Sequence, residues 1–165
     1  VGCRSRYRWR SFMYDNLFDH VNIDKANTHV PNGHADDLEE EAVRYESFIQ
    51  SLGGIDLQLL GIGHNGHIGF NEPTDNFPAT VHTVQLTEST INANSRLFER
   101  REDVPTQAIT MGIGTIMKAK KILLIAGPDK AEIVEKACFG KVTPEVPASV
   151  LQLHPDVTVI LSAGK

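Results

Sequence analysis

The sequence is poor in three features, and each shortage excludes a class of protein. Its 165 residues include only two cysteines, too few for a disulfide framework, which fits a reducing compartment and makes the cytoplasm the expected location. No apolar run approaches the roughly 20 residues of a membrane-spanning helix, and no signal peptide is visible. Positive charge is also scarce: 16 Lys and Arg against 21 Asp and Glu give a net charge of −5, which argues against a binder of nucleic acid or membrane surfaces.

What is present predicts a folded α/β domain. The apolar share of 41% is enough for a packed core, and the length is that of one domain. Helical spacing and capping signals predict helices at residues 8–20, 38–52, 88–99, 108–119, 129–139 and 147–153. Short apolar or alternating runs predict strands at residues 55–62, 80–86, 121–127 and 157–161. Because the strands alternate with helices, we expect a three-layer, Rossmann-like fold with a largely parallel sheet flanked by helices.

One segment carries most of the chemistry. Residues 61–73 read Gly-Ile-Gly-His-Asn-Gly-His-Ile-Gly-Phe-Asn-Glu-Pro, and they follow a predicted strand, where ligands bind in open α/β sheets. The first six residues satisfy G-x-G-x-x-G, the dinucleotide fingerprint, but that site needs a helix starting within the glycines. Gly69, Asn71 and Pro73 interrupt any such helix, so a nicotinamide site is disfavoured.

Two other interpretations of this segment depend on its histidines. His64 and His67 have H-x-x-H spacing, which with Glu72 would suggest a metal site, although no predicted helix sets their faces. A plain polar loop is the simplest alternative. The local density of imidazole, carboxylate and carboxamide groups instead favours general acid–base chemistry on a polyhydroxylated substrate, with His67 and Glu72 as candidates for the acid–base pair.

The string Gly-His-Ile-Gly-Phe-Asn-Glu-Pro, residues 66–73, closely resembles that of the glucosamine-6-phosphate deaminases, and the resemblance extends from about Phe12 to Leu161. It implies the conversion of D-glucosamine 6-phosphate and water to D-fructose 6-phosphate and ammonia, in the catabolism of N-acetylglucosamine. No redox cofactor and no obligatory catalytic metal follow from that chemistry. The resemblance implies that His67 accepts a proton in opening the pyranose ring, assisted by Asn65 and Glu72.

The resemblance also implies two ligands for the sugar phosphate, Arg96 and Lys130. A guanidinium and an ammonium are suitable phosphate partners, although without the resemblance both residues would be taken as ordinary solvated positions. Homo-oligomers occur in the family, and some are hexamers activated by N-acetylglucosamine 6-phosphate through basic side chains. His82 and Val84 stand at those positions here, which argues against that regulation.

The sequence departs from the family pattern in one important respect. No residue matches the family's isomerisation base, an aspartate, or its Gly-rich phosphate loop; Asp15 and Asp19 fall within a predicted helix in another part of the pattern. We therefore expect residues 1–165 to form a single partial sugar-phosphate isomerase/deaminase domain, inactive alone and with an exposed apolar sheet face.

Two competing functions remain at this point. A 6-phosphogluconolactonase shares the fold and a Gly-His pair, but its motif resembles Pro-Asp-Gly-His-Thr and has no evident need for Asn71 and Glu72. A sugar-phosphate-sensing regulator would keep the pocket without catalysis, and it would require a DNA-binding module.

Overall fold

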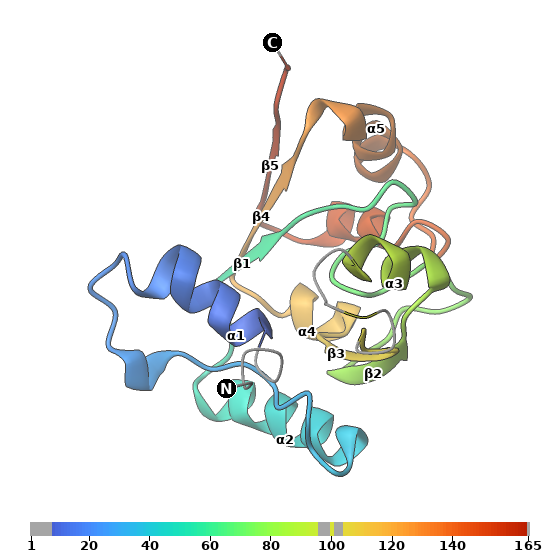
Figure 1. Ribbon diagram of the computed structural model, residues 1–165. Coiled ribbons are helices and arrows are strands. Elements are labelled where there is room, and N and C mark those ends of the chain that lie inside the picture. The colour runs from blue at the N-terminus through green and yellow to red at the C-terminus, as the bar shows by residue number, and fades with distance from the viewer. Residues whose placement is uncertain (1–7, 96–99, 101–103, 165) are drawn as a thin grey trace.

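The computed structural model describes residues 8–95, 100 and 104–164, in which a small parallel sheet is covered by helical segments on one face (Figure 1). The helical elements are α1 (Arg8–Met13), η1 (Tyr14–Phe18), η2 (Lys25–Asn27), α2 (Leu38–Ser51), α3 (Glu88–Ser95), α4 (Ile113–Met117), η4 (Pro128–Lys130), α5 (Ala131–Phe139) and η5 (Pro147–Leu153). The strands are β1 (Leu57–Leu60), β2 (His82–Gln85), β3 (Gln107–Thr110), β4 (Lys121–Ala126) and β5 (Val157–Leu161). None of the described helices is long and apolar enough to cross a membrane.

Three of the strands form a parallel sheet in the order β1-β4-β5. Leu60 of β1 pairs with Leu124 of β4, and Leu124 pairs with Val159 of β5. Because the strands are parallel, the loops after β1 and β4 leave the sheet at the same edge (Figure 1). The expected α/β fold with a largely parallel sheet is confirmed, and the loop of residues 61–73 starts at this edge.

The two faces of this sheet differ in burial. On one face Leu60, Ile122 and Leu124 are buried in a core that also includes residues of α5 and η5. On the other face the strands present apolar side chains that are largely exposed: Leu57 (55%), Leu59 (60%), Ile125 (47%) and Ile160 (49%). The expectation of an exposed apolar sheet face is confirmed.

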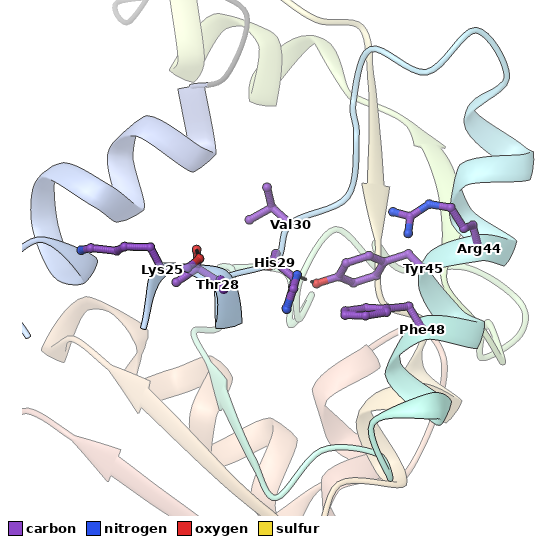
Figure 2. Close-up of a pocket in the computed structure, with 8 residues that line it drawn as sticks. Lys25, Thr28, His29, Val30, Arg44, Tyr45 and Phe48 are labelled. Atoms are coloured by element: carbon purple, nitrogen blue, oxygen red, sulfur yellow. Dashed lines mark hydrogen bonds between the residues drawn. The ribbon is translucent and has the colours of Figure 1, made fainter. Parts of the chain in front are cut away.

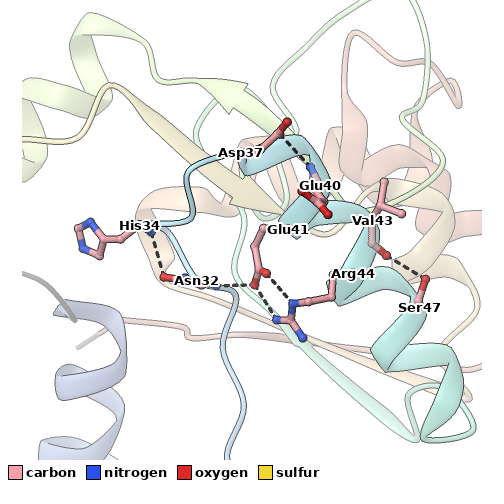
Figure 3. Close-up of polar contacts among 8 residues, drawn as sticks. All are labelled: Asn32, His34, Asp37, Glu40, Glu41, Val43, Arg44 and Ser47. Carbon is pink, nitrogen blue, oxygen red and sulfur yellow. Dashed lines mark hydrogen bonds and ion pairs between the residues drawn. The ribbon is translucent and has the colours of Figure 1, made fainter.

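Helix α2 begins and ends as the sequence predicts. The Asp37 carboxylate accepts hydrogen bonds from the backbone N–H groups of Glu39 (2.9 Å) and Glu40 (3.0 Å), which caps the first turn. Figure 3 shows the second of these bonds. Gly53 follows the last turn with a φ of 86°, a left-handed conformation that favours glycine.

A buried carboxylate joins α2 to the preceding loop. Glu41 accepts from the Arg44 guanidinium at 2.5 and 2.6 Å and from the backbone N–H of Asn32 at 2.7 Å (Figure 3). The Arg44 hydrogen bond is the main cause that lowers the pKa of Glu41; burial raises it by less, and the Asn32 N–H adds to the lowering. The ion pair lies within α2, and the hydrogen bond from the Asn32 N–H is what ties the preceding loop to the helix.

A second buried carboxylate, Glu46, joins α2 to two other elements. It accepts from the Thr115 hydroxyl (2.7 Å), the Val81 N–H (3.1 Å) and the Gln50 amide (3.1 Å). Burial raises the pKa of Glu46, but these hydrogen bonds and the charge of Lys118 together outweigh burial and leave the pKa below its ordinary value. Glu46 therefore stays charged inside the molecule with its oxygens satisfied.

The sequence prediction was wrong for part of residues 108–119. Only Ile113–Met117 is helical (α4), and residues 107–110 form β3, which pairs antiparallel with β2. The chain changes direction at Gly112, where a Cβ atom would lie 2.2 Å from the carbonyl oxygen of Thr80. Pairing with β2 overrides the helical spacing, because the same apolar residues also suit a short strand.

The other predicted helices are found with shifted ends. The predicted helix 8–20 is α1 followed by a π-helical turn, η1. The predicted helix 88–99 is described as α3 up to Ser95, and residues 96–99 lie outside the described residues. The predicted helices 129–139 and 147–153 are present as η4 with α5 and as η5.

Candidate active site at the carboxyl ends of β1 and β4

The loop of residues 61–73 is a series of turns rather than a helix. The Gly63 N–H donates to the carbonyl of His67 (2.9 Å), and the Gly66 N–H donates to the carbonyl of Gly63 (2.9 Å). Gly66 has a φ of 87°, and a Cβ there would lie 2.7 Å from Val146. Since the dinucleotide fingerprint requires a helix to begin within these glycines, the structure argues against a nicotinamide site.

His67, Asn65 and Glu72 form a connected polar trio on this loop. Nδ1 of His67 lies 2.8 Å from Oδ1 of Asn65, and Nδ2 of Asn65 donates to Oε2 of Glu72 at 2.5 Å. Oε1 of Glu72 lies 3.4 Å from Nδ1 of His67. The structure therefore brings together His67 and Glu72, the acid–base pair that the sequence indicated, and Asn65, which the resemblance implies assists them.

This trio determines which histidine nitrogen carries the proton. The Glu72 carboxylate only accepts hydrogen bonds, so it orients the Asn65 amide with its NH₂ group toward Glu72 and its oxygen toward His67. That oxygen can only accept, so Nδ1 of His67 is the protonated nitrogen. Nε2 of the neutral imidazole keeps its lone pair and can accept a proton from a ligand.

The loop is held by neighbouring elements through contacts that sequence reasoning missed. The Phe70 N–H donates to the hydroxyl of Thr110 (3.1 Å), at the end of β3. The buried Asn71 amide donates to the carbonyls of Ile68 (2.9 Å) and Met111 (2.8 Å). These residues are far apart in sequence, so no local pattern could have indicated the contacts.

Lys130 reaches the same edge of the sheet from η4, directly after β4. Its ammonium contacts both ring nitrogens of His64, with Nζ 3.0 Å from Nε2. Asp129 completes the group, because its Oδ2 atom lies 3.2 Å from Nε2 of His64 and 3.6 Å from Nζ of Lys130. Arg96, the other predicted phosphate ligand, lies outside the described residues.

The proposed metal ligands do not converge. His64 turns to Lys130 and Asp129, whereas His67 turns to Asn65 and Glu72. Within the described part of the chain, no three His, Cys, Asp or Glu side chains are grouped so as to hold a metal ion.

A cavity of about 280 Å³ lies between α2 and the segment around η2 (Figure 2). Figure 2 shows the Tyr45 hydroxyl directed at the carbonyl of His29, a hydrogen bond of 3.4 Å, and the His29 ring beside that of Phe48, with centroids 4.6 Å apart. The lining residues are Lys25, Ala26, Thr28, His29, Val30, Arg44, Tyr45 and Phe48. None of these is a predicted site residue, so the cavity is separate from the candidate site.

The fold and the position of the polar residues define an α/β protein whose candidate site lies at the carboxyl ends of parallel strands. The family described as glucosamine-6-phosphate isomerases/6-phosphogluconolactonase matches residues 5–160. The chain belongs to this family, which confirms the resemblance seen in the sequence.

Individual relatives have a more specific name than the family does. The chain is 66% identical over 153 residues to a glucosamine-6-phosphate deaminase of Lachnoclostridium phytofermentans, covering 92% of this chain and 65% of the relative. It is 59% identical over 151 residues to one of Clostridioides difficile, covering 91% of this chain and 61% of the relative. The chain thus spans less than two thirds of the length of either relative.

Solved structures agree on the fold. A structure described as a monomeric glucosamine-6-phosphate deaminase superposes with a TM-score of 0.86 at 49% identity, covering 94% of this chain and 65% of that one. A 6-phosphogluconolactonase from Thermotoga maritima has a TM-score of 0.63 at 19% identity, covering 93% of this chain and 63% of that one, and shares the fold alone.

Proposed function

We propose that the protein carrying this chain converts D-glucosamine 6-phosphate and water to D-fructose 6-phosphate and ammonia, as a hydrolase acting on a carbon–nitrogen bond in amino-sugar catabolism. The observation that carries the proposal is the trio in which Glu72 orients Asn65 and Asn65 holds Nδ1–H of His67. The names of relatives at 66% and 59% identity support it.

In this proposal His67 is the catalytic residue for opening the sugar ring. Its Nε2 atom accepts the proton of the anomeric hydroxyl while the bond between C1 and the ring oxygen breaks, and the imidazolium then returns the proton to that oxygen. Glu72, 3.4 Å from Nδ1, stabilises the imidazolium in between. A base then moves the C2 proton to C1 while the C1 oxygen gains a proton and becomes a hydroxyl, which leaves an imine at C2. Water adds to C2, and ammonia leaves as the C2 carbonyl forms. No residue of this chain is assigned as that base.

Lys130 and Arg96 are the proposed ligands of the phosphate. The support for Lys130 is its place at the end of β4, beside the loop that carries His67. We propose the cytoplasm as the compartment, since the sequence has only two cysteines. For the whole protein, the homo-oligomer implied by the resemblance stands as a proposal beside the monomer described for the solved relative, and light scattering distinguishes them.

Ammonia release tests the proposed reaction. We would graft this chain in place of the matching 153 residues of the L. phytofermentans relative and assay the hybrid with glucosamine 6-phosphate. His67→Gln is expected to lower kcat by about 10²–10⁴-fold, the usual contribution of a general base. His20→Gln, at an exposed histidine outside the site, is the matched control.

Two outcomes would contradict the proposal. A hybrid that hydrolyses 6-phosphogluconolactone but releases no ammonia would favour the lactonase. A His67→Gln hybrid within about tenfold of the parent rate would exclude His67 as the proton acceptor.

A further inference from the structure

His64, Asp129 and Lys130 form a cluster of charged and titratable groups beside the candidate acid–base trio. His64 comes from the loop after β1, and the other two residues come from η4 after β4. The side chains of His64 and Asp129 are exposed (72% and 62%), whereas that of Lys130 is only 18% exposed. A ligand can therefore reach His64 and Asp129 from solvent, whereas Lys130 is largely buried next to them.

The Asp129 carboxylate has a defined place in this cluster. Its Oδ1 atom lies where a Cβ on Gly127 would be only 2.7 Å away, so the glycine makes room for it. Its other oxygen, Oδ2, lies 3.2 Å from Nε2 of His64. Asp129 is thus positioned to hold the imidazole ring next to Lys130.

The contact between His64 and Lys130 sets the charge of the ring when no anion is bound. The Lys130 ammonium can only donate, so Nδ1 of His64, the ring nitrogen that it approaches most closely, must accept, while Nε2 carries the proton toward the Asp129 carboxylate; this requires a neutral imidazole. A protonated ring would place two positive charges in contact, with the single negative charge of Asp129 to balance them. An additional anion at this point would remove that imbalance.

We propose that His64 is a second, proton-dependent cation for the phosphoryl group of the substrate, beside Lys130. The inference rests on the proposed function, because it places the sugar phosphate at Lys130. When a phosphoryl dianion binds against Lys130, its negative charge stabilises the imidazolium, so His64 takes up a proton as the anion binds. Asp129 keeps the ring in place through its contact with Nε2. Affinity for a dianion therefore rises as the pH falls through the range in which histidine titrates.

The other titratable groups near His64 are on its own loop. His67 and Glu72 pair with each other, and from η4 only Asp129 and Lys130 contact His64 among the described residues. Replacing His64 alone therefore leaves the pair of His67 and Glu72 in place.

Calorimetry on the 165-residue chain tests the inference without requiring turnover. The probes are inorganic sulfate, which stays a dianion at both pH values, and glucosamine 6-phosphate, each titrated at pH 6 and pH 8. The unsubstituted chain is expected to bind sulfate about five- to tenfold more tightly at pH 6, with proton uptake that appears as a dependence of the heat on the buffer.

Four variants separate the roles. His64→Gln is expected to bind sulfate equally at both pH values, with the affinity that the parent shows at pH 8. His64→Arg, a permanent cation, binds tightly at both. Lys130→Gln weakens binding at both, and His20→Gln, the matched control, leaves the pH ratio unchanged.

The remaining outcomes distinguish this inference from the proposed function. If the parent binds sulfate and His64→Gln keeps the parent's pH ratio, His64 has no such role, and the deaminase proposal stands. If the pH-dependent binding is found but the hybrid releases no ammonia, the anion site stands and the proposed reaction does not. If the parent binds neither probe, the inference is wrong, as is the assignment of the phosphate to Lys130.

Discussion

The imidazole of His67 lies directly against the backbone of Gly63. A Cβ atom at residue 63 would lie 2.1 Å from Cε1 of His67 and 2.3 Å from Nδ1, far inside van der Waals contact. The same two residues are joined by the hydrogen bond from the Gly63 N–H to the His67 carbonyl, at 2.9 Å. The absence of a side chain at residue 63 therefore determines where the proposed catalytic ring can lie.

Gly63→Ala is expected to displace the His67 ring while the fold is retained. Because misplacing a reacting group by about 1 Å can cost about 10²-fold, we expect a fall of that order in kcat for ammonia release by the hybrid. Gly61→Ala is the matched control, since a Cβ there has no neighbour within 4 Å. A Gly63→Ala hybrid with the parent kcat would show that the ring position does not matter.

Asn71→Leu is expected to destabilise the chain by about 2–4 kcal/mol, measured by urea denaturation. The substitution removes the amide that donates to the carbonyls of Ile68 and Met111. Asn71 is only 2% exposed, so these acceptors would lose their partner away from water. Asn76→Leu, at an exposed position of the same connection, is the control, and equal effects of the two substitutions would contradict the argument.

Asp37→Ala is expected to lower the free energy of unfolding by about 1 kcal/mol, through loss of the cap of α2. The carboxylate accepts from the N–H groups of Glu39 and Glu40, which otherwise have no partner within the helix. The neighbouring Asp36→Ala removes an equal charge without removing the cap. If the two variants have the same melting temperature, charge rather than capping is what matters at the start of α2.

The stability of the chain is expected to fall as the pH drops below about 4.5, partly because of Glu46. Its pKa is lower in the folded state than in the unfolded state, so the unfolded state binds more protons on acidification. The stabilisation is fully present above the unfolded pKa and is lost as the pH falls through the folded one. Glu46→Gln should flatten the dependence of unfolding free energy on pH as the pH falls below about 4.5. The exposed Glu135→Gln should leave the slope unchanged, and an unchanged slope in Glu46→Gln would contradict the prediction.

Much of the fold follows from local sequence patterns. The carboxylate of Asp37 and the glycine at residue 53 predict both ends of α2, and an unbroken apolar run predicts β4. These signals are reliable because caps and buried central strands depend on neighbouring residues. The antiparallel pairing of β2 with β3 was missed, because it depends on contact between segments separated in the chain.

In the candidate site, too, the residues on one loop could be predicted from sequence, whereas the contacts between separate loops could not. His67, Asn65 and Glu72 were identified from one short string, and the structure brings them within hydrogen-bonding distance. The contact of Lys130 with His64 was not predicted, since it arises from the adjacency of β1 and β4. A sequence motif identifies the functional groups on one loop. Only the order of strands in the sheet determines which second loop lies beside that loop.

The closed turn of residues 63–67 has a kinetic consequence. Its two backbone hydrogen bonds and the anchoring of Gly66 by the N–H of Ala148, at 2.9 Å, are formed within the chain itself. The imidazole is thus already oriented before any ligand binds, and its ordering was completed during folding. Association at this loop would then follow a single exponential at every concentration, with no slower rearrangement after the encounter.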